Sequence, residues 1–121
     1  MPIHKVLVVD DSPTELANIR SILSDSGLEV VSASSGEEAV NKARAERPDL
    51  IFMDIVMPGM DGFAACREIS HDSATKDIPV VFVSVKNQKA DRLWAQMQGG
   101  RGFISKPFVP DDIIEQLKAF Q

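Results

Sequence analysis

Five polar side chains in this sequence stand directly after short apolar runs, and their types suit chemistry on phosphoryl groups. They are Asp10, Asp11, Asp54, Ser84 and Lys106. Neighbouring carboxylates repel one another unless a proton or a cation joins them. Oxygen ligands without His or Cys favour Mg²⁺ or Mn²⁺. A carboxylate nucleophile, a metal ion, an ammonium group and a hydroxyl are together what an aspartyl-phosphate site needs.

Alternating strand and helix patterns along the chain must bring these groups together. Strands are predicted at 6–9, 28–33, 50–53, 78–84 and 102–105. Helices are predicted to begin at the caps Ser12 and Ser35, to cover 63–69 and the region of Leu93 to Met97, and to begin again at Pro110. Five β–α units with continuous apolar strands indicate an α/β protein with a parallel sheet covered by helices on both faces.

The order of the strands decides whether the polar groups meet. In the order 2-1-3-4-5, which is borrowed from known doubly wound sheets rather than derived, the first and third strands are neighbours. Asp10, Asp11 and Asp54 then converge at the carboxyl edge of the sheet, with the other two groups on the next strands. Unrelated structural roles would not place all five groups at one end of one sheet.

Composition bounds the class of protein and excludes several functions. The 121 residues are 44% hydrophobic and 26% charged, which is typical of one globular domain over residues 1–121. The last predicted helix reaches residue 121, so we expect no appended output domain. The chain has one cysteine and lacks an apolar run of about 18 residues, so we expect no membrane insertion and a cytoplasmic location. The net charge of −5 argues against direct nucleic-acid binding.

Several residues have ordinary structural roles as their best interpretation. Asp61 is expected to cap the third helix, and Glu15 and Glu38 are expected to complete capping boxes in the first two. Met97 is expected in the core, and Cys66 in the core or on a helix surface.

Four motifs in order identify a family resemblance over essentially the whole chain. They are VVDDS near the start, MDIVMPGMDG in the middle, the strand-end Ser84, and FISKPF near the end. With these motifs the chain resembles the receiver domains of two-component response regulators, the family of the chemotaxis-type receivers. SPTE after the acid pair and DRLWAQMQG at 91–99 resemble the stand-alone receivers of twitching-motility (type IV pilus) pathways.

The resemblance implies a flavodoxin-like (βα)5 three-layer sandwich and a role for each acidic group. Asp54 becomes the phosphoacceptor, the residue that accepts a phosphoryl group. Asp11 becomes a direct Mg²⁺ ligand and Asp10 a ligand largely through water, while Asp54 and the backbone carbonyl of Val56 complete the metal set.

The resemblance also assigns the remaining polar groups and the switch. Lys106 would bond the phosphoryl group, with a cis peptide before Pro107. Ser84 would be both a phosphoryl-stabilising group and the switch hydroxyl, at a position where Thr is common. Phe103 takes the place of the family's rotameric aromatic residue, which is often Tyr, and it lacks the phenol hydroxyl.

These roles imply a signalling protein and not a multiple-turnover enzyme. A histidine kinase, of the chemotaxis type, would phosphorylate Asp54. The protein would then dock a motility partner through the face formed by the helix around Leu93 to Met97, the strand 102–105 and the helix from Pro110, or act as a phosphate sink. An aspartate-nucleophile, Mg²⁺-dependent phosphatase and a phosphorylation-independent adaptor are the alternatives. A flavin-binding module is disfavoured because the acidic DDSPTE loop would repel a phosphate.

Overall fold

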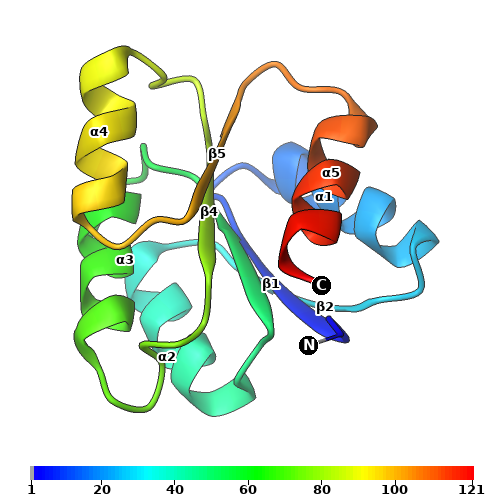
Figure 1. Cartoon of the computed structure of the whole chain (residues 1–121), viewed down its shortest axis with the longest axis horizontal. Helices are drawn as coiled ribbons and strands as arrows, with labels where there is room; N and C mark the ends of the chain where they lie inside the picture. Colours follow the sequence, from blue (N-terminus) through cyan, green and yellow to red (C-terminus); the bar gives the residue numbers. More distant parts are fainter. Residues whose placement is uncertain (1) are drawn as a thin grey trace.

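Strands and helices alternate from one end of the chain to the other in the computed structural model, which describes residues 2–121 (Figure 1). The strands are β1 (Lys5–Val9), β2 (Glu29–Ala33), β3 (Leu50–Met53), β4 (Val80–Ser84) and β5 (Gly102–Ser105). The helices are α1 (Pro13–Asp25), α2 (Gly36–Glu46), α3 (Gly62–His71), α4 (Lys89–Met97) and α5 (Pro110–Phe120). All ten predicted elements are present, with boundaries shifted by a few residues.

The five strands form one parallel sheet in the order β2-β1-β3-β4-β5, which confirms the predicted order. Figure 1 shows α1 and α5 on one face of this sheet and α2, α3 and α4 on the other. Between β1 and its two neighbours, Val9 is in register with Ala33 of β2 and with Met53 of β3. The residues that follow these strands therefore leave the sheet at one level, which is the edge where ligands bind in such folds.

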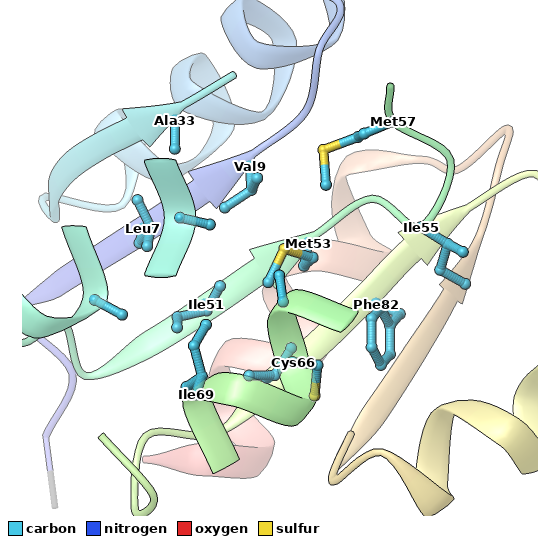
Figure 2. Close-up of a cluster of buried hydrophobic side chains, with 14 of the residues drawn as sticks. Leu7, Val9, Ala33, Ile51, Met53, Ile55, Met57, Cys66, Ile69 and Phe82 are labelled. Atoms are coloured by element: carbon cyan, nitrogen blue, oxygen red, sulfur yellow. The ribbon is translucent and has the colours of Figure 1, made fainter. Parts of the chain in front are cut away.

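Each face of the sheet has its own core, because successive strand residues point to opposite faces. On the face of α1 and α5, Val8 and Phe52 pack with Ile19 and Ile113. On the other face, Leu7 and Ile51 pack with α2 and α3 (Figure 2). Figure 2 shows Cys66 and Ile69 of α3 turned toward this second core, and both are buried. Cys66 is therefore a core residue, within the range that the sequence predicted.

The prediction for Met97 was wrong. Its side chain is 66% exposed at the end of α4, beside the exposed Leu93 and Trp94. The inward residue of this helix is Ala95, which is small and does not stand out in the sequence. Among residues 2–121, every helix is too short or too polar to span a bilayer.

The outer edge of the sheet at β2 is covered by side chains from both layers of helices. The guanidinium of Arg20 on α1 donates to the carbonyl of Val30 at 3.1 Å. The ammonium of Lys42 on α2 donates to the carbonyl of Ser32. Backbone acceptors on an exposed edge strand can pair with another chain, and here two of them are already bonded.

Candidate functional site

The backbone at the carboxyl edge of the sheet brings the loops after β1 and β3 together. The amide of Asp54 donates to the carbonyl of Val9 at 2.9 Å, so the ladder between β1 and β3 continues one step past the strands. The amide of Asp10 donates to the carbonyl of Ala33 at 3.1 Å. These bonds fix the first acidic residue of each loop. Both side chains are largely buried, at 3% exposure for Asp10 and 10% for Asp54.

The ammonium group of Lys106 enters this acidic pocket from the loop after β5. Its Nζ lies 2.8 Å from Oδ2 of Asp10 and 3.4 Å from Oδ2 of Asp54. Glu15, on the first turn of α1, lies 3.9 Å from the same Nζ. The backbone of Lys106 is held by its amide, which donates to the carbonyl of Ser84 at 3.0 Å. The ammonium is therefore an internal counter-ion for the carboxylates.

The predicted acidic set fits a hard divalent cation. One carboxylate oxygen from each of Asp10, Asp11 and Asp54 lies within 4.8 Å of the others. When ionised, these three groups and Lys106 leave an excess of about two negative charges, which a divalent ion would neutralise. The donors are oxygens without nitrogen or sulfur, and Asp11 is exposed to solvent, as suits an ion that keeps bound water.

Burial and neighbouring charges act in opposite directions on the ionisation of Asp54. Burial raises the pKa of Asp54, and the neighbouring Asp10 raises it further, while Lys106 and the amide of Ile55 oppose the shift. Burial works against the charged form of Lys106, yet the hydrogen bond to Asp10 and the nearby negative charges raise its pKa overall. Lys106 therefore stays protonated at neutral pH and can stabilise negative charge on an incoming group.

The loop between β3 and α3 is closely packed where it leaves Asp54. The amide of Ile55 donates to Oδ1 of Asp54 at 2.8 Å, and the carbonyl of Ile55 accepts from the amide of Gly62 at the same distance. A Cβ at Gly62 would collide with the backbone carbonyl of Asp54. The side chain of Asp61 accepts from the amide of Ala64, which confirms the predicted cap. Val56 lies between these fixed points, with an exposed side chain.

The two predicted switch residues lie on the neighbouring strands β4 and β5. Ser84 ends β4 and is fully buried, and its Oγ accepts from the amide of Lys86 at 3.1 Å. Phe103 on β5 is half-buried, with its ring centroid 6.4 Å from that of Phe82. The Lys106–Pro107 peptide bond is cis.

Some contacts at the site were not predicted from the sequence. Ser12 caps α1 as expected, but its amide donates to Oδ1 of Asp10, and Glu15 approaches Lys106 instead of completing a capping box. Arg92 of α4 lies over the ring of Phe103, with its guanidinium carbon 4.7 Å from the centroid. The same side chain donates to Oγ of Ser105 at 2.6 Å. Nothing in the local pattern of either segment signals these contacts.

Comparisons with known proteins agree with this geometry. The model of the response regulator receiver domain matches residues 6–118. Protein PilH of Pseudomonas aeruginosa is 40% identical over 115 residues, which are 95% of each chain. The chemotaxis protein CheY4 of Vibrio cholerae is 31% identical with a TM-score of 0.92, covering 98% of this chain and 99% of its own.

A third relative, from Pseudomonas aeruginosa, is the receiver domain of a sensor histidine kinase, solved with magnesium in its active-site cleft. It is 27% identical with a TM-score of 0.89, covering 97% of this chain and 96% of its own. The resemblance found in the sequence motifs therefore extends to the matched family model and to the whole fold. The chain belongs to the receiver domains of two-component response regulators.

Proposed function

We propose that Asp54 is the phosphoacceptor of this receiver and that a histidine kinase is the donor. The observation that carries the proposal is a buried carboxylate 3.4 Å from the ammonium of Lys106 and grouped with Asp10 and Asp11. An oxygen of Asp54 would attack the phosphorus of a phosphohistidine. The new P–O bond would form as the P–N bond breaks, and the imidazole would leave. Release by water would follow, so the protein catalyses only its own phosphorylation and dephosphorylation.

Each surrounding group has a distinct part in this proposal. Mg²⁺, held by Asp10, Asp11, Asp54 and the carbonyl of Val56, would neutralise charge on the phosphoryl oxygens. Lys106 would contact a phosphoryl oxygen on the side toward α1. The buried hydroxyl of Ser84 would donate to another phosphoryl oxygen, since its Oγ only accepts from the amide of Lys86 and its O–H is left to donate. The electrostatic contribution is strong because Asp10, Asp54 and Lys106 are largely buried.

A shift of Ser84 toward the phosphoryl group would couple the site to the surface. Phosphorylation shifts a two-state equilibrium only by the difference between its interactions with the two states, and reversing a 1:99 population takes about 5.5 kcal/mol. Movement of Ser84 would free space beside Phe103, which lies on the adjacent strand β5. The face made by α4, β5 and α5 would then change its affinity for a partner.

The proposed setting is a motility pathway of the pilus or chemotaxis-like type. The similarity to PilH and to a chemotaxis protein supports it, together with the SPTE and DRLWAQMQG segments. We propose a chemotaxis-type kinase as donor and a motility protein as the partner on the α4–β5–α5 face, or a role in drawing phosphoryl groups from another regulator. One domain over residues 1–121, working in the cytoplasm, completes the proposal.

The experiment is an intact-mass measurement after incubation with acetyl phosphate and Mg²⁺. The wild-type protein should gain one phosphoryl group. Asp54→Asn, which keeps the size of the side chain and loses the nucleophile, should gain none, and chelation of Mg²⁺ should prevent the gain in the wild type. A steady release of phosphate from many different phosphate esters would instead favour the phosphatase. No gain from acetyl phosphate or a kinase would favour the adaptor.

A further inference from the structure

Glu37, an exposed residue on the first turn of α2, contacts the loop that follows Asp54. Its Oε1 accepts a hydrogen bond from the backbone amide of Met60 at 2.8 Å. The two residues are 23 positions apart in the sequence. This bond lies outside the acidic pocket, and neither the family motifs nor the proposed phosphoryl chemistry uses it.

The first turn of α2 packs against the same part of the loop through its backbone. A Cβ at Gly36 would collide with the carbonyl of Met60, so only glycine allows this close approach. Gly59 has φ +73°, and a Cβ there would lie 3.2 Å from Oε1 of Glu37. The side chain of Met60 packs against the core on the α2–α3 face. The turn at 59–60 is therefore shaped to fit the start of α2.

Hydrogen bonds hold the short segment 56–59 at both of its ends. The near end is the one next to Asp54, and the far end is the one next to α3. At the near end, Ile55 is bonded to Asp54 and to Gly62. At the far end, the amide of Met60 is bonded to Glu37, and Asp61 caps α3. Residues 56–59 lie between the two ends, and they include the carbonyl of Val56. That carbonyl can serve a metal ion only when the segment holds one conformation.

We propose that Glu37 is a positioning residue for the metal site: its bond to the Met60 amide holds the β3–α3 loop so that the Val56 carbonyl faces the acidic cluster. The inference rests on the proposed function, because the loop matters only when Asp54 and its neighbours bind Mg²⁺. Glu37 itself touches neither the metal nor the phosphoryl group. Its effect is carried by the conformation of the loop.

The test compares Glu37→Ala with Glu37→Gln. Alanine removes the acceptor, whereas glutamine removes the charge and keeps an amide oxygen that can accept from Met60. Glu38→Ala is the matched control, since Glu38 lies on the same turn but bonds the amide of Ser34. Hydrogen exchange of the Met60 amide, followed by NMR without metal, reports the bond directly. Titration of amide shifts with Mg²⁺ gives the dissociation constant.

Glu37→Ala should speed exchange at Met60 and weaken Mg²⁺ binding about three- to tenfold, the size expected for losing one typical, solvent-exposed hydrogen bond. Glu37→Gln should stay close to wild type in both measurements, and Glu38→Ala should leave both unchanged. Equal weakening by alanine and glutamine would overturn the inference, because the carboxylate would then act only through its charge. Unchanged exchange in Glu37→Ala would also overturn it.

The two proposals can fail separately. Wild-type protein that neither binds Mg²⁺ nor accepts a phosphoryl group would remove the proposed function, and the role of Glu37 with it. Wild-type protein that does both, while Glu37→Ala matches it in Mg²⁺ affinity, would remove only the role of Glu37.

Discussion

Two neighbouring helices on the same face of the sheet, α3 and α4, are attached to it very differently. All residues of both helices are described by the structure. The ten residues of α3 bury Gly62, Ala65, Cys66 and Ile69, whereas the nine residues of α4 bury only Ala95. The helix that follows the acidic pocket is thus part of the core. The helix beside Phe103, α4, contributes little to the core and is held mainly by side chains on its surface.

The attachment of α4 is largely polar and leaves space beneath it. Arg92 contacts the ring of Phe103 and the hydroxyl of Ser105 on β5. A pocket of about 200 Å³ lies between α4 and β5, lined by Ala95, Phe103 and their neighbours. Segments with few buried apolar contacts open or shift at low free-energy cost. The comparison indicates a rigid acidic pocket beside a helix that can be displaced at low free-energy cost.

The largest expected loss of stability comes from substituting Gly62, at the start of α3, by alanine. The new Cβ would overlap the carbonyl of Asp54, and neither α3 nor β3 can move without disturbing the core. We expect a loss of at least about 4 kcal/mol in the free energy of unfolding, a size reserved for severe defects. Urea unfolding followed by circular dichroism measures it.

Gly100→Ala is the matching substitution beside α4. A Cβ there would lie 2.7 Å from the ring of Phe82 and 2.9 Å from the carbonyl of Ala95. Because the turn at 99–100 can move away from Phe82 together with α4, we expect a loss of only about 1–2 kcal/mol. Equal losses of stability for Gly62→Ala and Gly100→Ala would contradict this difference, because α4 would then be packed as rigidly as α3.

Truncation of one apolar side chain on each helix compares directly how much each helix contributes to stability. Ile69 of α3 is 1% exposed, so Ile69→Ala should cost about 3 kcal/mol of unfolding free energy through lost contacts and a cavity. Met97 of α4 is 66% exposed, and Met97→Ala should change stability by less than about 0.5 kcal/mol. Thermal or urea unfolding separates the two. A cost above about 1 kcal/mol for Met97→Ala would contradict the exposed position of that side chain.

The contact between Arg92 and Phe103 should have a small effect on ligand affinity. An exposed cation–π contact contributes about 0.5–1 kcal/mol. If this contact holds Phe103 only in the unphosphorylated state, Arg92→Ala should tighten binding of the phosphoryl mimic beryllofluoride about two- to fivefold. Trp94 fluorescence would follow the titration.

Lys89→Ala is the control for Arg92, because it removes a positive charge from the same exposed helix. It should leave the affinity for beryllofluoride near the wild-type value. An equal gain in Arg92→Ala and Lys89→Ala would assign the effect to charge and not to the contact with the ring.

The sequence was sufficient for the individual strands and helices because their signals are local, whereas the acidic pocket also needed the order of the strands. Continuous apolar runs such as Val80–Ser84 can only be buried strands between helices, and polar residues at their ends must meet at one edge. The order of the strands was borrowed from known sheets, and the structure confirms it. The placement of Asp10, Asp54 and Lys106 within one pocket follows from that order.

The rest depended on tertiary contacts that no local pattern encodes. Met97 has the character of a core residue, yet its side of α4 faces solvent. Glu15 fits a capping box by spacing, but Asp10 takes the amide of Ser12 and Lys106 attracts the carboxylate. Glu37 and Met60, or Arg92 and Phe103, are brought together only by the packing of helices on the sheet.

The covered edge at β2 limits how copies of this protein can associate. With Arg20 on Val30 and Lys42 on Ser32, a second chain cannot extend the sheet there without displacing two cations. At the other edge, β5 is only four residues long. Strand-to-strand polymerisation is thereby discouraged even at high cellular concentration. Association of copies is then left to side-chain contacts and not to strand addition at β2.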